Sequence, residues 1–449
     1  MELSMFYDYD ACQECGTCLY RCQVMNLGIE EARVEIKRLR AGDKPRYIDS
    51  RCASCFSCNV YCPNGCNPYG LILYRWYQRY LRHGLPVRAQ LAMPLEEVNF
   101  NTMARKHHTL HEREMVEEWE RNADSPQAVA EAGGTVLYAG CNAQILPCLL
   151  DTSLLDGLTV IGAQELCCGE LYYRLGLMDV VQRQARKLEE RFRRLGMRRM
   201  YVYCMAGFNN LTNVLPSCFG ADFDFEIVYL GDLLMQRLEK GELNFDRPLE
   251  GTATIQDSCH AKVLGRRLQD IPRELVRRAG LEIMGMAHSR EMSVCCGAAC
   301  GARAYNPLHM GLQSLRQWGE ARDSGVDGLV AYCATCLLLL HMGRIIRPTR
   351  MPLYHLMEVL MRASGEEPPH DLVAARAATY LPIYWPGAFH ACSCRARSGC
   401  RCCIGAGRHD GPNGTGVDAG GCYLEGDIGC IEIQGFPANT IFYDATRLR

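Results

Sequence analysis

The spacing of the cysteines constrains this chain more than any other feature of its sequence. Five of them form a widely spread pattern in the second half: 35 residues separate a single cysteine from an adjacent pair, and 36 separate the pair from a closing C-x-x-C. These are Cys259, Cys295, Cys296, Cys333 and Cys336. Thiols so distant in sequence meet only if the chain folds back repeatedly. The pattern therefore indicates a metal-cluster site and not a ladder of disulfides.

An incomplete copy of the same pattern precedes the complete one. Its members are Cys141, Cys167, Cys168 and Cys204. Gly207 stands where the last cysteine of C-x-x-C is expected, and only 25 residues separate Cys141 from the adjacent pair. The flanking sequences also match, since TVLYAGC corresponds to TATIQDSCH, ELCCGE to SVCCGA and MYVYC to GLVAYC, which indicates an internal duplication. The first copy is one ligand short, so whether it binds a cluster of the same type stays open.

The N-terminal region carries two runs of C-x2-C-x2-C-x3-C. They are Cys12, Cys15, Cys18 and Cys22, then Cys52, Cys55, Cys58 and Cys62, the last followed by Pro63. This is the run of a two-cluster ferredoxin, in which the fourth cysteine binds the other cluster. We therefore expect one [4Fe–4S] cubane on Cys12, Cys15, Cys18 and Cys62, and the other on Cys52, Cys55, Cys58 and Cys22. Zinc is the alternative, because C-x-x-C pairs also bind zinc, but two runs at ferredoxin spacing favour clusters.

Composition narrows the setting of the protein. The cysteine spacing follows cluster motifs, and the N-terminal MELSMFYDYDAC has no basic segment leading into an apolar one, so we expect a reducing cytoplasm. The longest apolar run, around Leu329 to Leu340, is shorter than the roughly 20 residues that cross a bilayer. We therefore expect no direct membrane span, and any membrane association through a partner subunit. The formal net charge of −2 gives no electrostatic case for nucleic acid.

The alternation of short apolar runs with helical segments predicts an α+β multidomain protein with parallel sheets built twice. The expected domains are a helical domain with two clusters (1–80), a helical connector and linker (81–133), a first α/β domain (134–245), a second α/β domain (246–365) and a Cys- and Gly-rich tail (366–449). Cys141, Cys204, Cys259 and Cys333 follow predicted strands, so they should lie at the carboxyl edges of the sheets. The adjacent cysteine pairs should lie on loops opposite. No G-x-G-x-x-G follows a strand, so we expect no flavin or nicotinamide site.

This combination of motifs resembles the cysteine-rich "CCG" domain family, found in the B and D subunits of heterodisulfide reductases. The resemblance covers about residues 8–365 and implies two Rossmann-like α/β domains. It also implies a noncubane [4Fe–4S] cluster on Cys259, Cys295, Cys296, Cys333 and Cys336, and a second on the first copy if four thiols suffice. A ferredoxin module followed by two such units is similar to the D subunit, to the K subunit of the dissimilatory sulfite reduction complex and to the iron–sulfur subunit of glycolate oxidase.

The resemblance implies that electrons pass between another subunit and a disulfide-type substrate. The partner would be a membrane cytochrome, a hydrogenase or a flavoprotein, and the substrate a heterodisulfide or a protein trisulfide. The alternative is a non-catalytic electron-transfer subunit of a flavin-dependent 2-hydroxyacid dehydrogenase of the glycolate oxidase kind. The complete C-x-x-C at Cys333 and Cys336 favours the catalytic interpretation.

Two further features carry weaker hypotheses. His260 directly follows a cluster cysteine and could donate a proton to a leaving thiolate; the alternative is that it supports a ligand structurally. The tail is rich in cysteine and could hold an additional metal, or a partner could cover it. Its cysteines are Cys392, Cys394, Cys400, Cys402, Cys403, Cys422 and Cys430.

Overall fold

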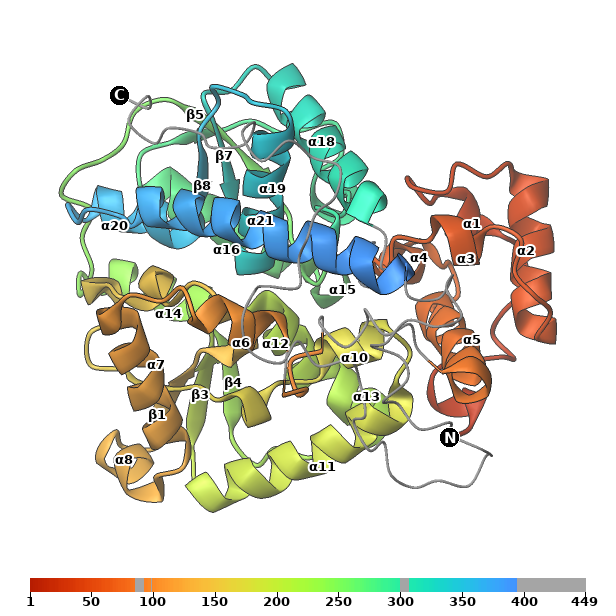
Figure 1. Cartoon of the computed structure of the whole chain (residues 1–449), viewed down its shortest axis with the longest axis horizontal. Coiled ribbons are helices and arrows are strands. Elements are labelled where there is room, and N and C mark those ends of the chain that lie inside the picture. Colours follow the sequence, from red (N-terminus) through yellow and green to blue (C-terminus); the bar gives the residue numbers. More distant parts are fainter. Residues whose placement is uncertain (85–92, 98, 299–306, 394–449) are drawn as a thin grey trace. The chain divides into compact units, whose positions relative to one another are not determined.

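A computed structural model describes residues 1–84, 93–97, 99–298 and 307–393 of the 449-residue chain, and Met1–Ala391 form one compact unit. The unit combines helices with parallel sheets, which confirms the predicted mixture of α and β structure (Figure 1). Among the described residues, no helix is long and apolar enough to cross a membrane. The hypothesis of a metal site on the tail cysteines falls outside the described side chains.

The N-terminal region is helical, as predicted. Its elements are the 3-10 turn η1 (Leu3–Met5) and helices α1 (Thr17–Tyr20), α2 (Ile29–Ala41), α3 (Ile48–Arg51), α4 (Ser57–Tyr61) and α5 (Pro68–His83). Helix α2 buries Ala32, Ile36 and Leu39, which recur at helical spacing, and Gly42 ends it in the left-handed conformation at φ 83°. The interval between the two cysteine runs thus forms the helix that its apolar spacing predicts.

Three helices connect this region to the first sheet: α6 (Phe100–Arg105), α7 (Leu110–Ala123) and α8 (Pro126–Glu131). Helix α8 lies in a segment that we expected to be a linker. The Ser125 side chain caps it, Pro126 occupies its first turn, and Val129 is fully buried. Val129 is the one buried apolar residue of this otherwise polar helix, and its burial packs the short helix against the protein.

The first sheet has four parallel strands in the order β2-β1-β3-β4. They are β1 (Thr135–Tyr138), β2 (Thr159–Ile161), β3 (Arg199–Val202) and β4 (Glu226–Tyr229). Its helices are α9 (Gly140–Ala143), α10 (Glu170–Arg174), α11 (Met178–Leu195), α12 (Met205–Asn209), α13 (Leu215–Phe219) and α14 (Leu230–Glu239), with a π-helical turn at Asn210–Val214. Short 3-10 turns lie at Pro147–Leu150, Ser153–Leu155 and Gln164–Leu166.

The second sheet has the equivalent strand order, β6-β5-β7-β8, again all parallel. Its strands are β5 (Thr252–Gln256), β6 (Glu282–Ile283), β7 (Gly328–Ala331) and β8 (Leu353–His355). Its helices are α15 (Ala261–Leu264), α16 (Arg266–Arg278), α18 (Pro307–Asp323), α19 (Ala334–Ile346), α20 (Leu356–Ala363) and α21 (His370–Ser393), with a 3-10 turn at Arg290–Met292. The shared order agrees with the duplication that the motifs predict.

The two faces of the first sheet pack against different parts of the protein. Val136 and Val202 lie in one hydrophobic cluster with α11 and the N-terminal helices, whereas Leu137 and Tyr201 lie in another with the second sheet. Both faces are therefore covered, which explains why the strands read as nearly continuous apolar runs. The N-terminal region also contacts the second α/β unit directly, through Gln23, Tyr61 and Lys262.

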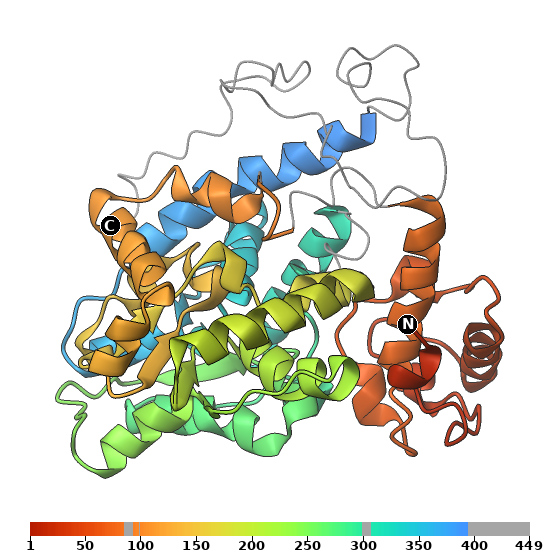
Figure 2. The same cartoon turned by 90° about the horizontal axis from the view of Figure 1, so that it is seen from below.

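Helix α21 extends the folded unit into the segment that we assigned to the tail. The Tyr380 ring packs edge-to-face on Phe100 with centroids 5.4 Å apart, and Arg376 pairs with Glu112. Figure 2 shows α21 running beside the connector helices, which come from a distant part of the sequence. The apolar positions of α21 thus complete the core over the connector.

Candidate metal-cluster sites

The two N-terminal cysteine runs adopt the same backbone turn. Glu14 and Ser54, each two residues after the first cysteine of its run, have φ of 54° and 55°, and Gly16 and Phe56 have φ of 76° and 64°. The turn directs the Glu14 and Ser54 amides at the sulfurs of Cys12 and Cys52, at 3.5 and 3.3 Å. Left-handed conformations cost energy for residues other than glycine, and they concentrate at functional sites.

The structure brings thiols of the two runs together. Burial raises the pKa of Cys18, and the thiols of Cys62, Cys15 and Cys12 raise it further. Burial and Cys55 likewise raise the pKa of Cys22 to about 11. Each run thus places its fourth cysteine, Cys62 or Cys22, beside cysteines of the other run. This is the neighbourhood that the predicted crossing requires, although the ligand assignment itself stays a prediction.

The two sets differ in their access to solvent. Cys12, Cys15 and Cys62 are half-buried, whereas Cys22, Cys52, Cys55 and Cys58 are buried. Cys55 also packs in the hydrophobic cluster that contains Cys295 and Cys296 of the second α/β unit. We call Cys12, Cys15, Cys18 and Cys62 the outer set. We call Cys22, Cys52, Cys55 and Cys58 the inner set.

The complete pattern converges at the carboxyl edge of the second sheet. Cys259 follows β5, the adjacent pair follows β6, and Cys333 is the N-cap residue of α19, after β7. The Cys336 thiol donates to Cys333, and together with the backbone amides of the α19 N-terminus this lowers the pKa of Cys333 to about 7. Cys336 also interacts with Cys296. Thiolates are the ligand form, so this favours metal binding by Cys333, whereas burial and the neighbouring thiols raise the pKa of Cys259, Cys296 and Cys336.

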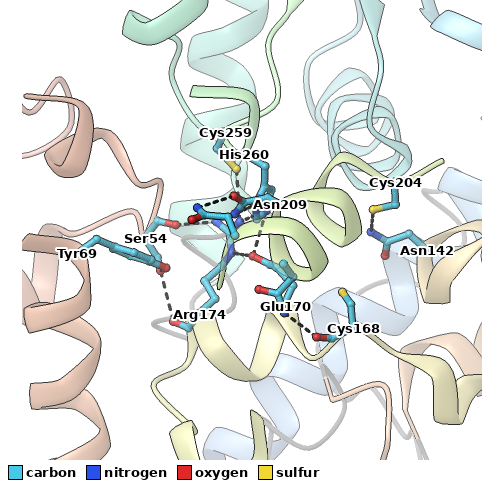
Figure 3. Close-up of polar contacts among 12 residues, drawn as sticks. Ser54, Tyr69, Asn142, Cys168, Glu170, Arg174, Cys204, Asn209, Cys259 and His260 are labelled. Atoms are coloured by element: carbon cyan, nitrogen blue, oxygen red, sulfur yellow. Dashed lines mark hydrogen bonds and ion pairs between the residues drawn. The ribbon is translucent and has the colours of Figure 1, made fainter. Parts of the chain in front are cut away.

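The first copy gathers its thiols at the equivalent edge. The sulfurs of Cys141 and Cys167 are 3.9 Å apart, and the Gly169 amide donates to the Cys167 sulfur at 3.5 Å. Cys204 is the N-cap residue of α12, and the Asn142 amide lies 3.6 Å from its sulfur (Figure 3). In both copies the pair follows the second strand, so it shares the carboxyl edge with the single cysteines.

The two copies differ by a tyrosine, which only the first has at the end of its first strand. Tyr138, at the end of β1, is 1% exposed, and burial together with all four first-copy thiols raises its pKa. Its hydroxyl donates to the carbonyl of Leu166, directly before the cysteine pair. A Cβ added at Gly207 would lie 3.5 Å from the Tyr138 ring. The ring therefore lies among the cysteines, beside the position where the fifth thiol is missing.

The second copy has a smaller side chain at the equivalent position. Gln256 ends β5, and its amide donates to the carbonyl of Val294, directly before the second cysteine pair, at 3.2 Å. Both copies thus tether the cysteine pair in the same way. At this position the first copy has an aromatic ring and the second has the amide of Gln256.

A buried polar network joins all three regions (Figure 3). Arg174 of α10 donates to the Ser54 carbonyl at 2.6 Å, to the Glu170 carboxylate at 2.5 Å and to the Cys259 sulfur at 3.4 Å. Burial alone would raise the pKa of Glu170, but Arg174 and His260 lower it to about 2. The first α/β unit thus supplies a cation to a ligand candidate of the second.

His260 lies inside this network and not at a surface. Its side chain is 4% exposed, its Nε2 lies 2.5 Å from Arg174 and 3.0 Å from Glu170, and its Nδ1 lies 3.2 Å from Asn209. Burial lowers its pKa, which favours the neutral ring. These contacts support the structural alternative for His260 over proton donation.

The spacing of the sulfurs bears on what they can bind. Among the described side chains, no three His, Cys, Asp or Glu groups are close enough to hold one metal ion. A four-iron cluster spreads its thiolate ligands over several irons, so they stand further apart than the ligands of a single zinc ion. Thiolate ligands suit iron–sulfur clusters by residue type, and the assignment of each cysteine to a cluster stays a prediction.

Sequence reasoning missed Arg174, Glu170, Lys262 and Tyr138. A signal existed for Arg174, because it is an isolated charge within the apolar stretch LYYRLGL that follows a cysteine pair. A charge in such a stretch must find a buried partner. Nothing in the sequence indicated that the partners would be Ser54 and Cys259, in two other regions.

Comparisons with known proteins agree with this geometry. Residues 253–341 match the cysteine-rich domain family CCG. The chain is 24% identical over 253 residues to the D subunit of dihydromethanophenazine:CoB–CoM heterodisulfide reductase from Methanosarcina barkeri, covering 53% of this chain and 60% of the relative. The prediction of a CCG-domain iron–sulfur protein similar to the heterodisulfide reductase D subunit is confirmed.

Other relatives are oxidoreductases with different names. The chain is 28% identical over 193 residues to EtfAB:quinone oxidoreductase of Syntrophomonas wolfei, covering 41% of this chain and 26% of the relative. It is 30% identical over 145 residues to the probable iron–sulfur-binding oxidoreductase FadF of Bacillus subtilis, covering 32% of this chain and 20% of the relative. The chain thus spans less than two thirds of each of these relatives.

Proposed function

We propose that this chain is the iron–sulfur subunit of a redox complex and that its second α/β unit reduces, or forms, a disulfide-type substrate. One observation carries the proposal: the inner ferredoxin set lies against the complete cysteine set. Arg174 contacts both the Ser54 carbonyl, between Cys52 and Cys55, and the Cys259 sulfur. A relay requires its centres to be adjacent, and this contact joins the two cysteine sets.

The residues of the chain have distinct roles in this proposal. The outer and inner sets would each hold a cubane [4Fe–4S] cluster, and Cys259, Cys295, Cys296, Cys333 and Cys336 a noncubane one. When bound, such clusters supply one-electron transfer and a sulfur-reactive iron centre. Three cysteines of the outer set are half-buried, so this set would receive electrons from a partner subunit, and the buried inner set would pass them to the second α/β unit.

The names of the relatives support an oxidoreductase subunit, and they also support a second candidate. The similarity to EtfAB:quinone oxidoreductase favours a subunit that only passes electrons, as in a flavin-dependent 2-hydroxyacid dehydrogenase complex. In that case the second α/β unit would hold a relay centre and have no disulfide substrate. Both functions need the same two cubane clusters, and the complete C-x-x-C at Cys333 and Cys336 favours the first.

A substrate assay separates the two candidates. The chain is purified anaerobically, reduced with viologen and given a small-molecule heterodisulfide, a protein trisulfide or an electron-transferring flavoprotein. Release of thiol or sulfide supports the proposal. Reoxidation by the flavoprotein alone, with every sulfur substrate inert, overturns it in favour of the second candidate. Cys218→Ala is the matched control, because this cysteine is buried but lies outside every motif.

A further inference from the structure

Lys262 differs from every other buried cation in the described part of the chain. Four cations are buried there: Arg174, Lys262, Arg273 and Arg376. The three arginines each contact a carboxylate, namely Glu170, Asp257 and Glu112. The Lys262 ammonium instead donates to the Ser57 hydroxyl at 2.8 Å and to the Ser293 carbonyl. Within the described residues, no carboxylate forms an ion pair with it.

A buried charge requires compensation. Moving an ammonium out of water costs several kcal/mol, and two hydrogen bonds to neutral oxygens supply no opposite charge to offset it. Lys262 is only 4% exposed, on the short helix α15 that packs against α4. A negative group that becomes part of the site would stabilise this arrangement.

The surroundings of Lys262 identify that group. Ser57 directly precedes Cys58 of the inner set, and Ser293 lies two residues before Cys295. Burial raises the pKa of both Cys22 and Cys259, and Lys262 is among the cations that oppose the rise. Its ammonium is thus in electrostatic range of thiols from two different ligand sets. Clusters bound by thiolates are negatively charged, and an added electron makes them more so.

We propose that Lys262 is a positioning residue that sets the reduction potentials of two clusters, the one on the inner set and the one on the complete cysteine set. Its positive charge would stabilise the electron that either cluster accepts. This inference rests on the proposed function, because it assumes that both sets bind clusters. Both hydrogen bonds of Lys262 are made beside the inner set and the second α/β unit, and not beside the outer set. Removal of the charge should therefore affect two of the three clusters.

The test replaces the charge while preserving the shape. Lys262→Gln keeps a donor for Ser57 and Ser293, Lys262→Met keeps the length of the side chain, and Lys262→Arg keeps the charge. Lys187→Met, which changes an exposed lysine on α11, is the control. Potentials are measured by anaerobic redox titration followed by electron paramagnetic resonance. Signals are assigned with Cys15→Ser and Cys295→Ala.

The neutral variants should make both neighbouring clusters harder to reduce. We expect about a tenfold lower equilibrium constant for one-electron reduction, equivalent to about 59 mV at each cluster. The outer cluster, Lys262→Arg and Lys187→Met should match the native protein. Cluster loss in both neutral variants but not in Lys262→Arg also supports a requirement for the charge. Unchanged potentials, or cluster loss in Lys262→Arg as well, would overturn the inference.

The same measurement separates this inference from the proposed function. If the native protein lacks a signal that disappears in Cys295→Ala, the second α/β unit holds no cluster and the proposed function fails. The reduction potential of the inner cluster in the Lys262 variants then still tests the inference. If all three signals are present and none shifts, only the inference fails.

Discussion

The two α/β units place their cysteines at equivalent positions, yet only one of them forms a complete site. In each unit the first strand precedes a single cysteine, the second strand an adjacent pair, and the third strand a helix capped by cysteine. The second unit then adds Cys336 in the first turn of α19, where the first unit has Gly207 in α12. The strand order is shared, so the difference lies in the residues and loops at the carboxyl edge of each sheet.

The missing thiol and the additional ring belong together. Tyr138 contacts the space at Gly207, while the second unit combines Gln256 with Cys336. The larger side chain stands in the unit that has no fifth thiol, which agrees with close packing of the site. The first unit instead contributes Arg174 to Cys259. The incomplete copy thus contributes a buried charge, Arg174, to the complete one.

The largest expected effect comes from removing equivalent cysteines in the two units. Cys296→Ala should lower disulfide-type reduction at least about a hundredfold, because it removes a ligand of the reacting centre. Cys168→Ala should lower it much less. The measurement is thiol release from reduced protein, restricted to variants that retain cubane absorbance. An inactive Cys168→Ala beside an active Cys296→Ala would transfer the catalytic site to the first unit.

The next effect is the loss of one whole cluster in the ferredoxin region. Cys22→Ala should damage the cluster of the second run, and Cys62→Ala that of the first, because the fourth cysteine crosses over. Iron content should fall by about four atoms at most in either variant. Electron paramagnetic resonance spectra of the two variants show which cluster is lost in each. Damage confined to the run that carries the substitution contradicts the crossing.

A third prediction concerns the charge that the first unit lends to the second. Arg174→Gln should destabilise the protein by about 3 kcal/mol, because it removes the guanidinium that pairs with the buried Glu170 carboxylate and leaves only His260 beside it. Urea unfolding of the apoprotein measures this change. The double variant Arg174→Gln with Glu170→Gln should recover part of the loss, since no buried charge remains alone. If the double variant is less stable than the single one, the ion pair is not the cause.

The smallest expected effect is a gain. Gly207→Cys alone should add little iron, because the Tyr138 ring still lies among the thiols. Gly207→Cys combined with Tyr138→Gln, which copies the second unit, should add up to about four iron atoms per chain. Iron analysis with Tyr138→Gln alone as control tests this. Equal iron in the single and double cysteine variants would show that the ring does not block the site.

Much of the fold followed from local patterns. The apolar spacing around Ile36 predicted α2, and the apolar runs ending at Tyr138, Val202 and Gln256 predicted strands whose carboxyl edges carry the cysteines. These patterns succeed because each element buries one face or one run. The helix at Pro126–Glu131 was not predicted, because its one buried apolar residue, Val129, lies in an otherwise polar segment.

The sequence by itself determined which residues could bind metal, because ligand chemistry depends on residue type and on spacing within one loop. The Cys12 and Cys52 runs carry that information locally, and the matching flanks of Cys141 and Cys259 carry it over the length of one domain. Only the tertiary structure decided which charges face the sulfurs. Arg174 and Lys262 find their partners across regions that are remote in sequence. Burial and electrostatic contact are set by the packing of whole elements, which no local pattern encodes.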